Sequence, residues 1–333
     1  MSRTGAAERA GAEKRLLFIT ATRVGDAVLS TGILRHLIER HPGIRVSVAC
    51  GPAAAPLFEA VPGLEDLFVM EKKSGSMHWL DLWKACIGRR WDVLVDLRRS
   101  LMPFALRAGV RFRRGKRHTR EHRVRQLAAV VSRDSDPPAP TLWAGEKHRA
   151  AAARFIPDGG PVLALGPTAN WAAKVWPAEN FAELMRRLTG PDGILPDARV
   201  AVLGAPGERP MAQAVLDAIS TERRIDLVGR IDLLTAYACL KRCAFYVGND
   251  SGLMHVAAAA GVPTLGLFGP SDDVFYAPWG SHCTAIRTQI PFESIFPPGF
   301  DHRTSGTLMD TLSVDAAEAA AHALWQRLAG KAA

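Results

Sequence analysis

The stretch GNDSGLMHVAAAAGVPTLGLFGPSD, from Gly248 to Asp272, says most about the fold of this chain. Two turn residues, an acid, a hydroxyl and a glycine lead into an uncharged helical pattern that stops at Gly261-Val262-Pro263. Apolar, strand-like residues stand on both sides, AFYVG (244–248) before the turn and TLGLF (264–268) after the helix. This order predicts a strand, a helix and a second strand of a parallel sheet.

The turn between the first strand and the helix has the composition of an anion site. Backbone N–H groups in the first turn of a helix lack partners, and they favour phosphate together with the positive end of the helix dipole. Gly252 lacks the Cβ that blocks close approach of a phosphate oxygen. The simpler interpretation is that Asp250 or Ser251 caps the helix, which accounts for one residue of the cluster only. We predict phosphate binding here, and His255, one turn further, fits either a packed histidine or a phosphate contact.

The same alternation of strand and helix runs through the rest of the chain. Strand-like runs stand at 15–21, 44–50, 66–70 and 91–97, and again at 161–167, 199–204 and 225–229. The segment 98–132 is basic and is expected to mix a short strand with helices. A linker at Ile156–Gly160 predicts two α/β domains, residues 1–157 and 161–333, with a ligand cleft between them. The alanine-rich Ser313–Leu328 is expected to form the last helix of the chain. This helix could pack on either domain.

A second polar turn, Thr22-Arg23-Val24-Gly25-Asp26, follows the opening strand. Asp26 fits either a helix N-cap or a carboxylate that takes a proton from an incoming hydroxyl. The chain has no GxGxxG fingerprint and no GxxxxGK[ST] loop, which disfavours a nicotinamide dehydrogenase and a P-loop nucleotide site.

The basic charge is concentrated in one segment. Ten arginines and Lys116 lie between Arg98 and Arg125, opposed by Glu121 alone, so this segment carries +10 in a chain of net charge +9. Such a segment favours an anionic partner, and the alternative for its distal part, 113–125, is a solvated arginine-rich surface. Its aromatic residues are only Phe104 and Phe112, too few to stack the bases of a nucleic acid, so no nucleic-acid partner is predicted.

The chain has the sequence pattern of a protein from a reducing compartment. Its five cysteines lack paired metal spacing; Cys239 and Cys243 fit two reduced core thiols better than a metal half-site. The remaining three are Cys50, Cys86 and Cys283. The N-terminal residues lack the apolar core of a signal peptide, and Pro263 interrupts the longest uncharged run, 251–271. We therefore predict a cytoplasmic protein without a membrane span.

The pattern D-S-G-L-M-H-x-A-A-A-x-G-V-P-x-L-x-L-F-G-P-x-D, residues 250–272, resembles the signature of glycosyltransferase family nine, the ADP-heptose:lipopolysaccharide heptosyltransferases. Val24-Gly25-Asp26 after the opening strand resembles the family's G-D loop, Lys174-Val175-Trp176-Pro177 its K-x-W-P segment, and Gly204…Glu208 its strand-end G…E. The resemblance covers nearly the whole chain. Arg23, where the family commonly has a small hydroxyl residue, and Trp171-Ala-Ala before Lys174 depart from the pattern.

The resemblance implies a GT-B fold, with two facing Rossmann-like domains and an inverting, metal-independent sugar transfer in their cleft. Asp26 would then be the general base, and Lys174 would neutralise the departing diphosphate. The implied donor-binding residues are Thr168, Asn170, Glu208 (on the nucleoside), Asp250, Ser251, Gly252, Leu253 and His255. The implied acceptor-binding residues are Arg23, Gly25, Arg98 and Arg99, the last two because they directly follow the strand 91–97.

The same resemblance implies transfer of a heptose from ADP-heptose to the lipopolysaccharide inner core, either Kdo-lipid A or a heptosylated core. No cofactor or metal is expected. The basic segment would dock on the anionic inner face of the inner membrane, which makes the protein a peripheral membrane enzyme. Two alternatives keep the fold: a transferase that uses another nucleotide sugar, and a sugar-nucleotide epimerase.

Overall fold

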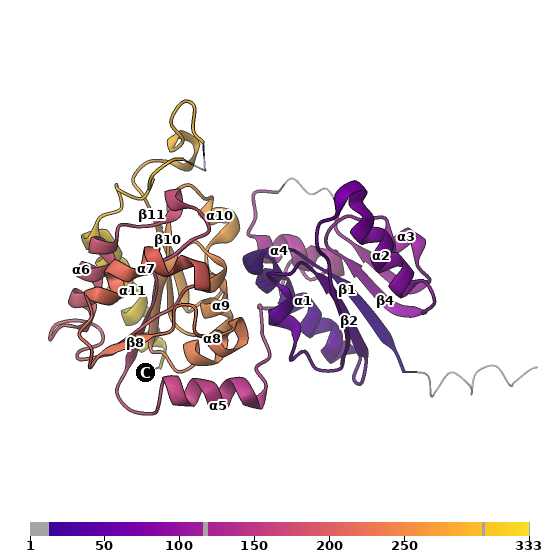
Figure 1. Ribbon diagram of the computed structural model, residues 1–333, viewed down its shortest axis with the longest axis horizontal. Helices are drawn as coiled ribbons and strands as arrows, with labels where there is room; N and C mark the ends of the chain where they lie inside the picture. The colour runs from indigo at the N-terminus through magenta and orange to yellow at the C-terminus, as the bar shows by residue number, and fades with distance from the viewer. Residues whose placement is uncertain (1–12, 116–118, 302–303, 333) are drawn as a thin grey trace, which may run out of the picture. The chain divides into compact units, whose positions relative to one another are not determined.

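The structure is a computed structural model that describes residues 13–115, 119–301 and 304–332. The described residues divide into two compact units (Figure 1). Residues up to Thr119 form the first unit together with Val124–Pro138, and Arg120–Arg123 belong to the second unit with the residues from Ala139 onward. Each unit is an α/β domain built on one sheet.

The first unit has a five-stranded parallel sheet in the order β3-β2-β1-β4-β5. Its strands are β1 (Arg15–Ile19), β2 (Arg45–Cys50), β3 (Leu64–Val69), β4 (Trp91–Asp96) and β5 (Ala108–Arg113). Its helices are α1 (Val24–Arg40), α2 (Met77–Cys86), α3 (Met102–Ala105) and α4 (Arg123–Ala128), the last of which begins at the boundary between the units. The central strands read as apolar runs because helices cover both faces of a parallel sheet, whereas the edge strand β5 is largely exposed.

The second unit has a six-stranded parallel sheet in the order β11-β10-β9-β6-β7-β8. Its strands are β6 (Val162–Gly166), β7 (Arg199–Val202), β8 (Arg224–Asp226), β9 (Phe245–Asn249), β10 (Thr264–Phe268) and β11 (Cys283–Arg287). Its helices are α5 (Glu146–Phe155), α6 (Ala178–Thr189), α7 (Arg209–Asp217), α8 (Leu233–Leu240), α9 (Gly252–Ala260), α10 (Asp273–Tyr276) and α11 (Val314–Ala332).

The strand order of the second unit reverses between β6 and β9, since β7 and β8 lie on one side of β6 and β9, β10 and β11 lie on the other. Helix α6 packs on both α7 and α11, and α8 packs on both α5 and α9 (Figure 1). In open parallel sheets, ligands bind at the carboxyl ends of the strands where the order reverses. This places the loops after β6 and β9 where a ligand is expected.

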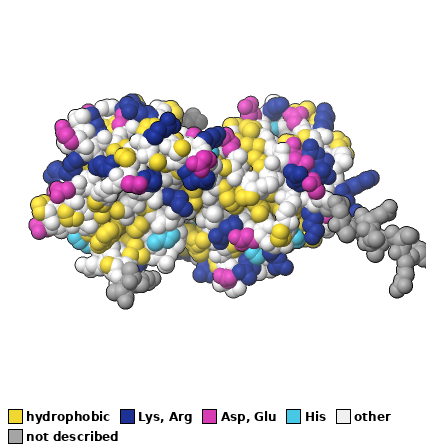
Figure 2. Space-filling view, turned by 90° about the horizontal axis from the view of Figure 1, so that it is seen from below, with side chains coloured by type: hydrophobic (Ala, Val, Ile, Leu, Met, Phe, Trp, Pro, Cys, Tyr) yellow, Lys and Arg dark blue, Asp and Glu magenta, His cyan; other side chains and the backbone are white. Residues whose placement is uncertain are grey.

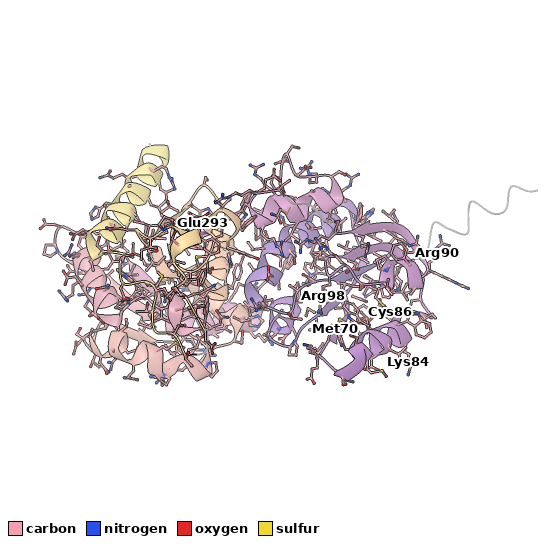
Figure 3. All side chains as sticks on the ribbon, turned by 90° about the horizontal axis from the view of Figure 1, so that it is seen from above. Met70, Lys84, Cys86, Arg90, Arg98 and Glu293 are labelled. Carbon is pink, nitrogen blue, oxygen red and sulfur yellow. The ribbon has the colours of Figure 1, made fainter. Side chains whose placement is uncertain are left out.

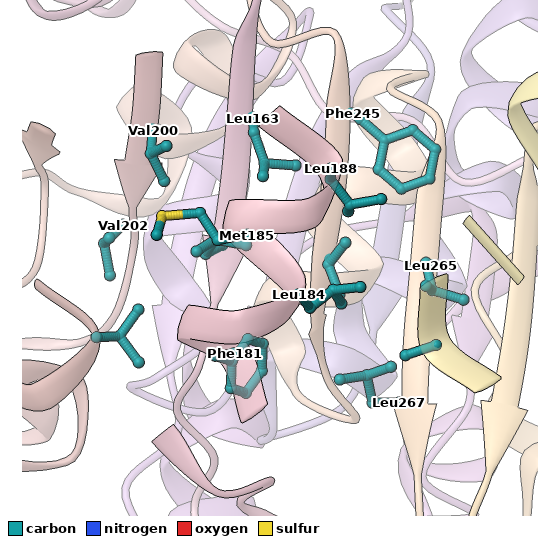
Figure 4. Close-up of a cluster of buried hydrophobic side chains, with 14 of the residues drawn as sticks. Leu163, Phe181, Leu184, Met185, Leu188, Val200, Val202, Phe245, Leu265 and Leu267 are labelled. Carbon is teal, nitrogen blue, oxygen red and sulfur yellow. The ribbon is translucent and has the colours of Figure 1, made fainter. Parts of the chain in front are cut away.

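The core of the second unit is formed by strand residues and one face of α6. Phe181, Leu184 and Leu188 recur at helical spacing and are fully buried against Leu163 and Val200 (Figure 4). The opposite face of α6 is polar, so this helix shows the amphipathic pattern of a sheet-covering helix. The predicted alternation of strands and helices is thus confirmed in the second unit; β11 and α10 were not predicted.

The first unit ends at Pro138, which is earlier in the chain than the linker expected at Ile156–Gly160. Helix α5, which precedes that segment, packs on α8 of the second unit. Arg242 donates to the Ile156 carbonyl and pairs with Asp158, so the expected linker is bound to the second unit. The closing helix α11 packs on α6 and β11, with Ala317, Ala321 and Leu324 buried, and belongs to the same unit.

All five cysteines are buried and free, which agrees with the prediction that Cys239 and Cys243 are core thiols. Burial raises the pKa of Cys50, Cys86, Cys239 and Cys283 to about 12, so these thiols stay protonated at neutral pH. Within the described part of the chain, no helix is both long and apolar enough to cross a membrane.

Candidate functional site

Two facing glycines define the end of the sheet at the point where the strand order reverses. Gly166 of β6 and Gly248 of β9 are partners in register. Tyr246 is fully buried beside them, and its hydroxyl lies 2.0 Å from where a Cβ on Gly166 would stand and 2.3 Å from one on Gly248. Any larger residue at either position collides with the tyrosine. Burial raises the pKa of Tyr246, and the charge of Glu208 reinforces this effect, so the phenol stays neutral.

Asn249 joins the loops that follow β6 and β9. Its side chain is fully buried, its Oδ1 accepts from the backbone N–H of Trp176 at 3.2 Å, and its Nδ2 donates to the Pro167 carbonyl at 2.9 Å. Asn249 is not among the site residues predicted from the sequence. The available signal was a polar residue at the end of an otherwise apolar strand, where a buried amide requires specific partners.

Lys174 and Asp250 form an ion pair at the edge of these loops. The side chains are 18% and 9% exposed, so both charges are largely removed from water. The backbone around Lys174 is fixed from the segment before α11, because Leu308 N–H donates to the Ala173 carbonyl at 3.0 Å and the Thr307 hydroxyl to the Val175 carbonyl at 2.6 Å. An ammonium group has three donors, so the ion pair with Asp250 leaves donor capacity for a second anion.

The amino end of α9 begins beside this pair. Ser251 is the N-cap residue in extended geometry, and its side chain makes no capping hydrogen bond. The carboxylate of Asp250 is bound to Lys174 instead. The capping interpretation is therefore wrong for both residues. Gly252 and Leu253 in the first turn are partly exposed, whereas His255 is 4% exposed and belongs to the packed interior of the helix.

Glu208 and Thr168 form a second polar contact, between the loops after β7 and β6. The buried Thr168 hydroxyl donates to Glu208 Oε2 at 2.6 Å, and the Ala205 N–H donates to the same oxygen at 2.8 Å. Asn170, two residues beyond Thr168, is exposed. The structure thus brings Thr168, Glu208, Lys174, Asp250 and Ser251 to the carboxyl ends of neighbouring strands, as the donor-site prediction requires.

In the first unit, the predicted turn leads from β1 into α1. Arg23 is the exposed N-cap residue without a capping side-chain bond, and Gly25 and Asp26 lie in the first turn of the helix. Asp26 is thus inside the helix, and its interpretation as an N-cap is wrong. A 2.7 Å hydrogen bond between the buried hydroxyls of Thr20, just before the turn, and Ser30 of α1 helps to fix the turn. An acid in a first turn is favoured by the helix dipole.

Arg98 and Arg99 follow β4 but differ in their surroundings. The buried Asp96 carboxylate accepts from the Arg98 N–H at 2.8 Å and from the Ser100 hydroxyl at 2.9 Å, which fixes the turn. The half-buried guanidinium of Arg98 (Figure 3) lies over the Trp79 ring at 5.1 Å, and burial lowers its pKa, an effect that Asp96 opposes. Arg99 is exposed, adopts a left-handed φ of 60°, and donates to the Gly115 carbonyl at 2.9 Å.

Neither a metal cluster nor a surface hollow between β3 and α2 marks these positions. Among the residues that the structure describes, no group of three or more His, Cys, Asp or Glu side chains is arranged to hold a metal ion. A surface hollow of about 500 Å³ lies between β3 and α2 of the first unit, lined in part by Met70, His78 and Asp81. None of the predicted site residues lines it.

Two parallel-sheet α/β domains, with a polar cluster at the carboxyl ends of β6 and β9, define a protein of the GT-B class. Solved structures agree on the fold. A glycosyl transferase family 9 protein from Veillonella parvula matches with a TM-score of 0.73 at 19% identity, over 94% of this chain and 97% of the other. The E. coli ADP-heptose lps heptosyltransferase II matches with a TM-score of 0.70 at 23% identity, over 94% and 99%.

The chain belongs to glycosyltransferase family 9 (heptosyltransferase), whose family model matches residues 82–294. It is therefore a glycosyltransferase. Lipopolysaccharide heptosyltransferase 2 of Salmonella typhimurium is 26% identical over 312 residues, which cover 82% of this chain and 88% of the relative. The matched segment includes Lys174, Glu208 and the 250–255 turn, whereas Asp26 lies before it.

Proposed function

We propose that this glycosyltransferase moves a heptose from ADP-heptose to the lipopolysaccharide inner core, either Kdo-lipid A or a heptosylated core. Relatives named lipopolysaccharide heptosyltransferase 2 support the sugar and the acceptor class. The observation that carries the proposal is the Lys174 ammonium, held by Asp250 beside the uncapped amino end of α9. This arrangement is suited to a diphosphate.

The donor side of the reaction uses the second unit. As the bond between the anomeric carbon and the diphosphate oxygen breaks, negative charge develops on the departing ADP. Lys174 and the backbone N–H groups of Gly252 and Leu253 stabilise this charge, because they are already oriented before the reaction begins. Asp250 holds the ammonium in position, and no metal ion is required for this role.

Glu208 contacts the nucleoside in this proposal. Both of its intramolecular hydrogen bonds use Oε2, which leaves Oε1 available to a ribose hydroxyl. Thr168 positions the carboxylate from a buried site, and the exposed Asn170 contributes a further polar contact. Ser251 and His255 complete the proposed donor set. His255 is buried in α9, so its contribution comes from the interior side of the helix.

The acceptor side uses the first unit. The acceptor hydroxyl attacks the anomeric carbon from the face opposite the diphosphate and inverts its configuration, while Asp26 takes the hydroxyl proton. Arg23, Gly25, Arg98 and Arg99 bind the acceptor, since its phosphates and carboxylates suit guanidinium groups. The basic segment 98–125 holds the protein peripherally at the cytoplasmic face of the inner membrane; Lys116 and Arg117 of this segment lie outside the described residues.

A transfer assay tests this function directly. The full-length protein is incubated with Kdo-lipid A or heptosylated core and, in separate reactions, with ADP-heptose, UDP-glucose or GDP-mannose. We expect product only from ADP-heptose. Epimerisation of a nucleotide sugar without an acceptor, or transfer from another nucleotide sugar, would overturn the proposal.

Asp26→Asn tests the general base within the same assay. We expect kcat to fall by about 10²–10⁴-fold with ADP affinity within about twofold of wild type, because general-base catalysis is worth this much. Glu39→Gln is the matched control, an exposed acid near the other end of α1 that pairs with Arg35, and it should leave kcat unchanged. Loss of ADP binding in Asp26→Asn would show that the residue has a structural role instead.

A further inference from the structure

The turn between β4 and β5 exposes two large apolar side chains. Leu101 and Phe104 are 76% and 73% exposed, more than any other large hydrophobic residue in the described part of the chain. Exposure of one such residue is common in soluble proteins, but two on one short turn indicate a contact surface. Residues Leu101, Met102, Pro103 and Phe104 are called the 101–104 turn below.

The 101–104 turn is held rigidly by its neighbours. Met102 and Leu106 are 3% exposed and belong to the core of the first unit. The Ser100 hydroxyl donates to the Asp96 carboxylate and accepts from the Met102 N–H at 3.1 Å. Met102 is therefore fixed in the core while Leu101 and Phe104 stay exposed, which indicates an ordered turn.

Arginines surround the exposed side chains. The Arg113 guanidinium lies 5.4 Å from the centre of the Phe104 ring, and Arg111 donates to the Pro103 carbonyl at 2.7 Å. Arg107, two residues beyond the end of α3, is exposed. Residues 97–115 contain six arginines and no acid, and no described carboxylate forms a salt bridge with Arg107, Arg111 or Arg113. Elsewhere basic and acidic side chains are interspersed, as on the face shown in Figure 2.

We propose that the 101–104 turn inserts Leu101 and Phe104 into the interface of an anionic lipid bilayer, with Arg107, Arg111 and Arg113 on the lipid headgroups. Apolar side chains rimmed by arginine match the boundary between acyl chains and anionic headgroups. The inference deepens the proposed function and rests on it, because an acceptor built on lipid A is met at a bilayer surface.

Other occupants fit the surface less well. A stable interface with a second copy of the chain buries about 800 Å² on each partner, far more than two side chains provide, and it would bring like-charged arginines together. A nucleic acid would use several aromatic platforms, whereas this turn offers one ring. Arginines on an edge strand also discourage strand pairing, but this role does not account for the exposed Leu101 and Phe104.

Vesicle co-sedimentation of the full-length protein tests the inference. The vesicles contain either phosphatidylcholine alone or equal parts of phosphatidylcholine and phosphatidylglycerol. We expect wild type to bind the phosphatidylglycerol vesicles and Leu101→Ser/Phe104→Ser to bind them about 10–100-fold more weakly, because two apolar groups no longer leave water. Arg107→Gln should weaken binding less and reduce its dependence on salt.

A matched control replaces two partly exposed apolar residues of the second unit. Phe155→Ser/Ile290→Ser, again one aromatic and one aliphatic residue, should bind vesicles like wild type. Leu101→Ser/Phe104→Ser should melt at the wild-type temperature, since both replaced side chains are largely exposed. Equal vesicle binding by wild type and Leu101→Ser/Phe104→Ser would overturn the inference, as would a concentration-dependent dimer that this variant abolishes.

Activity assays separate this inference from the proposed function. Leu101→Ser/Phe104→Ser should transfer heptose to a deacylated, water-soluble acceptor at the wild-type rate but lose activity on acceptor embedded in vesicles. Failure of wild type on both acceptors would contradict the proposed function. Wild-type activity of the variant on both acceptors would contradict the membrane role alone.

Discussion

Lys174 and Asp250 show at the scale of single residues how stability and function are combined. Their side chains are 18% and 9% exposed, so each charge depends on the other for compensation. Removing one member of a buried ion pair leaves an uncompensated charge, whereas replacing both by neutral groups of similar size is often tolerated. This difference allows the structural role of Lys174 to be separated from its role towards a diphosphate.

We predict that Lys174→Met lowers the free energy of unfolding by about 3–5 kcal/mol, because the Asp250 carboxylate stays buried without a partner. The double variant Lys174→Met/Asp250→Asn should recover most of this loss in a denaturant titration. Its kcat should nevertheless stay about 10²–10³-fold below wild type, since one charge-stabilising donor is missing. If transfer recovers together with stability, Lys174 acts only as a structural partner of Asp250.

At the scale of elements, the site depends on how closely β6 and β9 approach at their carboxyl ends. Gly166 and Gly248 are partners in register, and the Tyr246 hydroxyl occupies the space where their Cβ atoms would stand. The loop that follows Gly248 carries Asn249, which holds the loop after β6 through two hydrogen bonds. Strand packing therefore positions Lys174 and the start of α9 together.

Gly248→Ala tests this arrangement. Its Cβ would lie 2.3 Å from the Tyr246 hydroxyl and 2.9 Å from the Gly166 carbonyl oxygen. We expect unfolding free energy to fall by about 1–3 kcal/mol through overpacking, and ADP affinity to fall because the 249–252 loop shifts. Gly207→Ala is the control, since no atom lies within 4 Å of its added Cβ. Wild-type stability in Gly248→Ala, measured by denaturant titration, would contradict the packing described here.

At the scale of the whole molecule, the sequence predicts the two parallel sheets because central parallel strands are continuous apolar runs between helical segments. The donor cluster follows from the same pattern, since carboxyl ends of parallel strands meet at one edge of a sheet. The pairing of Lys174 with Asp250 could not be read from the chain, because 76 residues separate them and nothing local marks the contact. The attachment of Ile156 to the second unit could not be read from the chain for a similar reason, as Arg242 binds it from 86 residues away.

A crystal structure of the protein with ADP bound is the most direct test of the central claim. We predict a phosphate oxygen within hydrogen-bond distance of Lys174 Nζ and of a backbone N–H in the first turn of α9. This prediction would be contradicted by a diphosphate bound elsewhere, for example in the hollow between β3 and α2, with Lys174 still bound to Asp250 alone.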